Sequence, residues 1–227
     1  MDNLSEQITG LPQWIFSVGT YTVVVNAETV IMTWLVMGIL ILFSLMATRE
    51  SKMIPNALQS FAELIVGTWD DLVKDGLGLD DRKYFPFICT IFLLFWLSNM
   101  IGIIPGLSEP TQDLNTTLSL GVVGFFVAHY SGIKFKGIKN YLKSYCEPIF
   151  FMAPLNIIGE LSKVISISFR LFGNIKGGAI IILVVSALVY SLLLPPFLYG
   201  FFGLFIGTIQ AFVFTMLTLV YIVVQIR

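Results

Sequence analysis

Four ionisable side chains lie inside one long apolar stretch of the sequence, where charge is costly. They fall between residues 148 and 194 and are Glu160, Lys163, Arg170 and Lys176. Insertion scales put the cost of one such charge at the centre of a membrane helix at about 2.5–3.5 kcal/mol, and charges at that depth typically serve ion pathways or contacts between charged partners. This stretch is therefore the first candidate for a functional site.

A helical projection places most of the polar groups of this stretch on one face. At 100° per residue, an arc of about 80° holds five of them: Asn156, Glu160, Lys163, Arg170 and Asn174. Lys176 falls almost opposite. Glu160 and Lys163 are three residues apart and can simply neutralise each other. Lys176 can extend its ammonium group to a membrane boundary.

Arg170 is harder to explain as a structural residue. An arginine guanidinium group stays charged in proteins. The nearest acid on the same face, Glu160, is ten residues away, or roughly 15 Å along a helix axis. We therefore expect Arg170 to face water or a carboxylate that belongs to another molecule.

Other polar residues stand beside or inside the remaining apolar segments. Gln210 lies deep in the last one, where it either holds two helices together or continues the polar path of Arg170. His129 and Ser131 come near the end of the third segment. Asp113 and Asn115 precede that segment and suit either a helix cap or the mouth of an aqueous cleft.

The composition indicates that most of the chain lies in a lipid membrane. Of its 227 residues, 56% are hydrophobic and only 12% are charged, and the mean hydropathy is +0.88. These values exclude an ordinary cytosolic enzyme, a disordered protein and a nucleic-acid binder. Two isolated cysteines, one histidine and the lack of any nucleotide-binding or hydrolase motif predict no metal site, no cofactor and no active site.

The sequence predicts an all-α integral membrane protein with five crossings. The apolar segments span residues 30–47, 84–104, 116–133, 148–194 and 197–226. Residues 56–73 mix apolar and polar side chains at helical spacing, which predicts an amphipathic helix at the membrane surface or against a partner, or else a soluble cap helix.

The last two segments are too long to stand upright in a bilayer. A continuous helix over 148–194 would measure roughly 70 Å and one over 197–226 roughly 45 Å, against about 30 Å of hydrocarbon. Either a turn is hidden near residues 173–178, or the helices are strongly tilted. The Pro195-Pro196 pair between the segments favours a tilted hairpin.

The distribution of Lys and Arg predicts the orientation. With the N-terminal segment 1–29 outside, ten of the 13 basic residues fall inside, four of them in the loop 134–147, and the outside segments hold none. The C-terminus is then cytoplasmic.

Several motifs resemble one protein family. Residues 165–174 read ISISFRLFGN, which is similar to the signature of the a subunit of F-type ATP synthases. Supporting stretches follow the expected order: NMIGIIPG at 99–106, PTQDLNTTL at 110–118, PLNII at 154–158 and IQAFVFTMLTLVYIV at 209–223. The resemblance covers about residues 30 to 226, and the short N-terminus and span count look bacterial.

The resemblance implies a membrane stator without an active site of its own. Arg170 matches the essential arginine of the family, which faces a ring of c subunits, each with an ion-binding carboxylate. The arginine draws that carboxylate to its charged form, which releases the ion, and blocks leakage between two offset half-channels. Asn174 and Gln210 match polar positions beside the arginine.

The resemblance also implies residues of the half-channels. Asp113, Asn115 and Ser131 match positions of the outer half-channel, Ser166 matches one near the inner half-channel, and Lys163 matches a common basic position. Glu160, Lys176 and His129 are further candidates.

Two positions depart from the family pattern. Many relatives carry Glu nine residues after the arginine and an ionisable residue seven before the glutamine, where this chain has Ala179 and Gly203.

Partners implied by the family are the c-subunit ring, the b subunits of the peripheral stalk and the other ATP synthase subunits, in a bacterial plasma membrane. Family frequency favours H⁺ as the ion, with Na⁺ as the alternative. A stand-alone transporter or channel in which Arg170 binds an anion is a rival interpretation, which inverted repeats would favour, and the sequence shows none. A purely structural assembly subunit would leave Arg170 unexplained.

Overall fold

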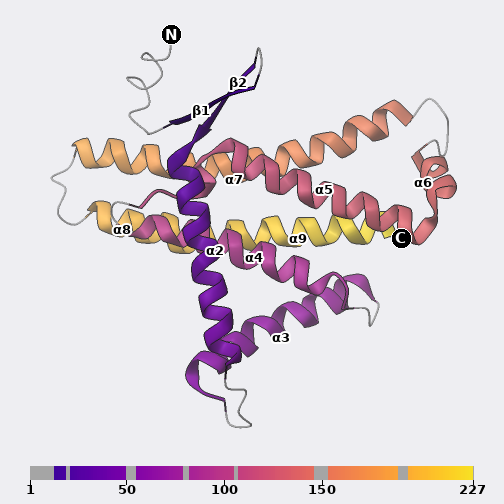
Figure 1. Cartoon of the computed structure of the whole chain (residues 1–227), viewed down its shortest axis with the longest axis horizontal. Helices are drawn as coiled ribbons and strands as arrows, with labels where there is room; N and C mark the ends of the chain where they lie inside the picture. Colours follow the sequence, from indigo (N-terminus) through magenta and orange to yellow (C-terminus); the bar gives the residue numbers. More distant parts are fainter. Residues whose placement is uncertain are drawn as a thin grey trace.

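The computed structural model of the chain (Figure 1) describes residues 13–18, 21–49, 55–78, 82–104, 107–145, 153–188 and 194–226. Five helices in it are long and apolar enough to cross a membrane. They are α2 (Ala27–Thr48), α4 (Phe85–Met100) with the short helix η1 (Ile101–Ile103), α5 (Leu114–Lys136), α7 (Ala153–Leu188) and the helix Pro196–Ile226. The prediction of an all-α protein with five candidate crossings is confirmed.

The last of these helices consists of three consecutive pieces. It begins with α8 (Leu194–Gly200), passes through a π-helical turn labelled η4 (Phe201–Ile206) and continues as α9 (Gly207–Ile226). A π-helical turn inside a membrane helix is a feature often found at functional sites. The predicted segment 197–226 is thus helical throughout.

The long segment before it contains no turn within its described residues, 153–188. α7 is one continuous helix of 36 residues that runs through residues 173–178, so the alternative of a hidden turn at this place is wrong. Its length of roughly 54 Å far exceeds the hydrocarbon thickness of a bilayer. The flanking residues 148–152 and 189–193 of the predicted segment lie outside the described residues.

The amphipathic helix α3 (Ala57–Leu77) starts close to the predicted position and ends at Leu77, four residues after the predicted end. Gly78 adopts a left-handed conformation with φ of 63°, which closes the helix. Trp69 is buried and packs against Phe92 of α4 and Phe212 of α9, with ring centroids 4.6 and 5.8 Å apart. Part of the apolar face of α3 is therefore covered by the chain itself.

Two small elements were not predicted. In the segment 1–29, β1 (Gln13–Val18) and β2 (Tyr21–Asn26) form an antiparallel hairpin that leads directly into α2. In the basic loop 134–147, residues Ile138–Tyr145 form the short helix α6. Two 3-10 turns, η1 and η2 (Pro110–Gln112), lie between α4 and α5. The hairpin strands have six residues each and α6 has eight, which is shorter than the window over which an apolar pattern distinguishes helix from strand.

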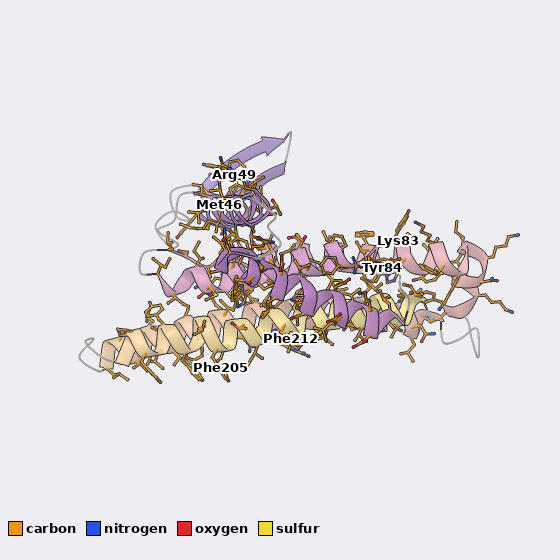
Figure 2. The ribbon with its side chains drawn as sticks, turned by 90° about the horizontal axis from the view of Figure 1, so that it is seen from below. Met46, Arg49, Lys83, Tyr84, Phe205 and Phe212 are labelled. Atoms are coloured by element: carbon orange, nitrogen blue, oxygen red, sulfur yellow. The ribbon has the colours of Figure 1, made fainter. Side chains whose placement is uncertain are left out.

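The helices pack as layers rather than as a parallel bundle. In Figure 1, α2 runs across α4, α5, α7 and α9 instead of alongside them. α5 packs against both α7 and α9, and α4 packs against α9. Figure 2 shows Phe205 at the edge of the molecule opposite Met46 and Arg49 of α2. In the described part of the chain, α7 and α9 expose many apolar side chains, among them Phe169, Leu183 and Phe212, and we call this exposed surface the free face of α7 and α9.

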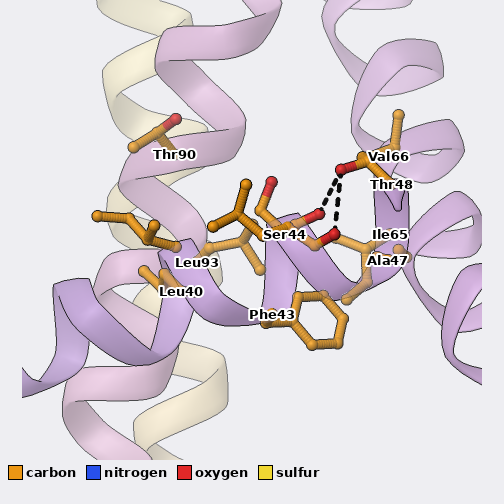
Figure 3. A pocket seen from close by; sticks show the side chains of 12 residues that line it. Leu40, Phe43, Ser44, Ala47, Thr48, Ile65, Val66, Thr90 and Leu93 are labelled. Carbon is orange, nitrogen blue, oxygen red and sulfur yellow. Dashed lines mark hydrogen bonds between the residues drawn. The ribbon is translucent and has the colours of Figure 1, made fainter. Parts of the chain in front are cut away.

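An apolar cavity of about 390 Å³ lies at the junction of α2, α3 and α4 (Figure 3). Leu40, Phe43, Ile65 and Leu93 are among its lining residues. The Thr48 hydroxyl there donates to the carbonyl oxygen of Ser44 at 2.7 Å, within its own helix. Because this cavity is mostly apolar, the candidate functional side chains are sought on α7, on α9 and in the loop before α5.

Candidate functional site

Arg170 lies on the exposed face of α7, next to Phe169, of which 51% is exposed. Within the part of the chain that the structure describes, Arg170 forms no ion pair and no hydrogen bond. An unpaired guanidinium group on the outer face of a membrane helix is unfavourable in lipid. The geometry therefore requires a partner of opposite charge, or water, on this face.

An amide pair stands one turn from Arg170. Asn174 Nδ2 donates to Gln210 Oε1 of α9 at 2.7 Å. Gln210 is only 5% exposed, and its Nε2 group has no hydrogen-bond partner among the described residues. The bond joins α7 to α9, as expected of a residue that holds helices together, and the free donor leaves Gln210 able to bind a further polar group.

The opposite half of the polar stripe on α7 is paired. Lys163 Nζ lies 2.7 Å from Glu160 Oε1 and 5.5 Å from the ring centroid of Tyr221. Asn156 Nδ2 donates to the carbonyl oxygen of Tyr145 at 2.9 Å. A cavity of about 330 Å³, which we call the basic-end cavity, is lined by Asn156, Glu160 and Lys163 together with Lys136, Tyr145 and Gln225. The expected mutual neutralisation of Glu160 and Lys163 is present in the structure.

His129 belongs to a hydrogen-bonded chain beside the basic-end cavity. Its Nδ1 lies 3.0 Å from the carbonyl oxygen of Phe125, and Tyr145 Oη lies 3.2 Å from Nε2. Tyr141 Oη donates to Gln225 Oε1 at 3.1 Å and lies 3.0 Å from Tyr145 Oη. Burial raises the pKa of Tyr141 above its ordinary value. The two tyrosines were not identified from the sequence, because α6 was not predicted.

Ser131 and Ser166 occupy different environments. Ser131 is fully buried, donates to the carbonyl oxygen of Val127 at 2.6 Å and lies close to the basic end of α5. The structure therefore does not bring it together with Asp113, which stands at the other end of that helix. Ser166 is exposed on α7, one turn before Arg170.

Asp113 serves as a helix cap and also lines a cavity. Its carboxylate accepts a hydrogen bond from the Asn115 backbone N–H at 2.9 Å and another from Asn26 Nδ2 at 2.7 Å. It lines a cavity of about 380 Å³ with Glu28 of α2, Glu109 and Lys176 of α7. We call this the acidic-end cavity. Asn115 itself is exposed.

A third cavity of about 280 Å³ lies between α4, α7 and the η4–α9 helix, and we call it the central cavity. Its lining includes Asn174, Asn99 and Glu109, together with Ala179 and Gly203, the two positions that depart from the family pattern. Asn99 is buried, donates to the carbonyl oxygen of Gly207 at 2.9 Å and accepts from Thr111 at 2.8 Å. Glu109 and Asn99 were not identified as site residues from the sequence. The feature of the sequence that could have identified them is their position: an amide and a carboxylate lie on either side of the break between two membrane spans.

These residues define a class of protein. The chain is a multi-pass helical membrane protein in which an unpaired arginine and an amide pair lie on two long helices, with polar cavities toward both ends. Such an arrangement can bind and release an ion at a neighbouring charged surface.

Comparisons with known proteins agree with this class. The ATP synthase A chain family matches residues 30–223. The chain is 41% identical to ATP synthase subunit a 1 of Pelobacter propionicus over 201 residues, which cover 87% of this chain and 86% of the relative. It is 38% identical to ATP synthase subunit a of Geobacter sulfurreducens with the same coverage. The chain therefore belongs to the ATP synthase A chain family, as a non-catalytic membrane subunit of that complex.

Proposed function

We propose that the free face of α7 and α9 meets the ring of c subunits and that Arg170 controls ion release from the carboxylates of that ring. The observation that supports this most directly is the position of Arg170, charged, exposed and unpaired on a membrane helix. A carboxylate that approaches the guanidinium group is stabilised in its charged form and gives up its ion. The fixed positive charge also repels a cation that would pass directly.

We further propose that the cavities belong to two half-channels on either side of Arg170. The basic-end cavity, with Glu160, Lys163 and Asn156, would open to the inside, and Ser166 would lie on its way to Arg170. The acidic-end and central cavities, with Asp113, Lys176 and Asn174, would open to the outside. An ion must then ride on the ring to pass from one half-channel to the other, which couples ion flow to rotation.

The proposed setting is a bacterial plasma membrane with the N-terminus outside and the C-terminus in the cytoplasm. The excess of Lys and Arg in the segments assigned to the inside supports this orientation. The proposed ion is H⁺, and the proposed further partners are the b subunits of the peripheral stalk. If ATP hydrolysis by the purified complex depends on Na⁺ at neutral pH, the transported ion is Na⁺ and the proposal of H⁺ is wrong.

Site-specific photocrosslinking tests the contact with the ring. A photoreactive amino acid at Phe169, beside Arg170, should give a crosslink to the c subunit in membranes that contain the whole complex. The same amino acid at Trp34, which is exposed on α2, is the matched control and should give none. A c-subunit crosslink from Trp34 but not from Phe169 would contradict the proposal.

A further inference from the structure

Glu109 stands at the wall between two of the cavities. Three residues line both the acidic-end and the central cavity, namely Ser108, Glu109 and Gln112. On one side of this wall lie Glu28, Asp113 and Lys176, and on the other side lie Asn99 and Asn174. Glu109 is the one of the three wall residues that can bind and release a proton near neutral pH.

The fold provides space for this carboxylate. Gly102 is buried directly beneath the Glu109 side chain, and a Cβ atom at this position would collide with the carboxylate group. The neighbouring Ser108 hydroxyl donates to the Glu28 carboxylate instead. The Glu109 side chain thus packs against the backbone of η1 and is half-buried.

The charge environment of Glu109 suits proton exchange. The titratable groups that face it are Glu28 from α2, Asp113 at the start of α5, Lys176 from α7 and Tyr199 from α8. Burial raises the pKa of Glu109 to about 7, against a smaller opposing effect of the hydrogen bond with Gln112. Its protonated and charged forms are therefore both populated near neutral pH.

The central cavity contains few other candidates for this role. Among its described lining residues, Glu109 is the one carboxylic acid. Ala179 and Gly203 on the same cavity wall carry no ionisable group. A proton that crosses from the acidic-end cavity towards Asn174 and Gln210 thus meets one suitable carboxylate.

We propose that Glu109 carries protons between the acidic-end cavity and the central cavity, which makes it the proton-binding residue of the outer path. Its carboxylate accepts a proton from water in the first cavity and returns it to water in the second, so that no net charge stays on the residue. The inference rests on the proposed function, because it assumes that ions reach Arg170 from this side.

The test compares variants of the intact complex in membrane vesicles, with ATP-driven proton pumping measured from pH 6 to pH 8.5. Glu109→Gln removes the titrating group and keeps its size, and pumping should fall at least about tenfold. Asp71→Asn, an exposed acid on α3, is the matched control and should pump as wild type does. Glu109→Asp should retain part of the activity with a displaced pH profile.

A relocated carboxylate separates proton transfer from a structural role. The double variant Glu109→Gln with Ala179→Glu places an acid on another wall of the same cavity and should regain most of the lost pumping. Wild-type pumping by Glu109→Gln would overturn the inference, and so would a loss that Ala179→Glu does not reverse. If Arg170→Ala abolishes pumping in the same vesicles while Glu109→Gln does not, only this inference fails and the proposed function stands.

Discussion

At the residue scale, Arg170 and Lys176 form no ion pair and no hydrogen bond among the described residues, whereas other charges of the site are satisfied. Lys163 is paired with Glu160, Asp113 accepts from Asn26 and Asn115, and Arg170 has no partner among the described side chains. Lys176 lines the acidic-end cavity, whereas Arg170 lines none of the described cavities. Because an unpaired charge on a membrane helix is unfavourable, Arg170 is the residue for which we expect a partner in another molecule.

The geometry of the guanidinium group should matter as well as its charge. Arg170→Lys keeps the positive charge but replaces a planar fork of donors by a compact, strongly hydrated ammonium group. We expect ATP-driven pumping to fall to the background level, measured by dye quenching in vesicles with equal amounts of complex. Near-normal pumping by this variant would mean that charge alone is sufficient.

Gln210 should have a graded effect. Gln210→Leu removes the bond to Asn174 and the free Nε2 donor at a buried position, and we expect pumping to slow by about three- to tenfold, which corresponds to roughly 1 kcal/mol. The measurement is the initial rate of pumping. A wild-type rate would show that Gln210 only holds α7 and α9 together.

The sequence identified the site residues that interrupt apolar segments and missed those that depend on tertiary contacts. Arg170, Asn174 and Gln210 stand out because each is polar within a membrane helix. Glu109 lies in a loop, where a carboxylate is ordinary, and its interest arises only from burial beside Gly102. The structure was also needed to show that Ser131 and Asp113 are far apart, because they lie at opposite ends of α5.

At the element scale, small residues allow the helices to approach closely. A Cβ atom at Gly132 of α5 would lie 2.7 Å from the Tyr141 ring and 3.0 Å from the backbone oxygen of Gln225. Gly124 lies close to Thr218 in the same interface. Such contacts are the usual means by which membrane helices associate, because lipid provides little hydrophobic driving force between them.

Gly132→Ala should therefore destabilise the packing of α5 against α6 and α9. We expect a loss of about 1–3 kcal/mol of stability from overpacking, observed as a lower thermal unfolding midpoint of the purified complex. Gly38→Ala is the control, since a Cβ atom at that position of α2 meets nothing within 4 Å. Equal midpoints for the two variants would contradict the close approach of α5 and α9.

The link between α3 and α4 should depend on pH. Hydrogen bonds and charge from Lys74 and Arg82 hold the pKa of Asp70 below its usual value. A lowered pKa in the folded state means that this interaction stabilises the fold above about pH 4 and is lost as the pH falls through the lower folded value. The difference in unfolding midpoint between wild type and Asp70→Asn should disappear in strong acid, and Asp71→Asn should show no such pH dependence.

The helices that the sequence predicted best are the ones with long apolar runs. The boundaries of α2, α4 and α5 differ from the predicted segments by a few residues at most ends, because polar residues mark both ends of each run. The β-hairpin before α2 and the helix α6 could not be predicted in this way. Composition also could not decide whether residues 173–178 form a turn, since glycines are tolerated in membrane helices.

At the scale of the whole molecule, the layered arrangement places the functional groups at an edge. α2 lies on one side of the molecule and Phe205 of η4 lies at the opposite edge (Figure 2). Arg170 is exposed on α7. Cavities reach α7 and the η4–α9 helix from both ends. The free face of α7 and α9 is suited to a partner that moves along it, because the chain itself does not close over the charge.

ATP-driven ion pumping by vesicles that carry the intact complex is the most direct test of the central claim, with wild type compared to Arg170→Ala. We predict that the variant complex assembles, with this subunit present in normal amounts, and that pumping is abolished because the missing interaction is with the moving ring. Pumping that survives in the assembled variant would contradict the account and would make Arg170 a structural residue.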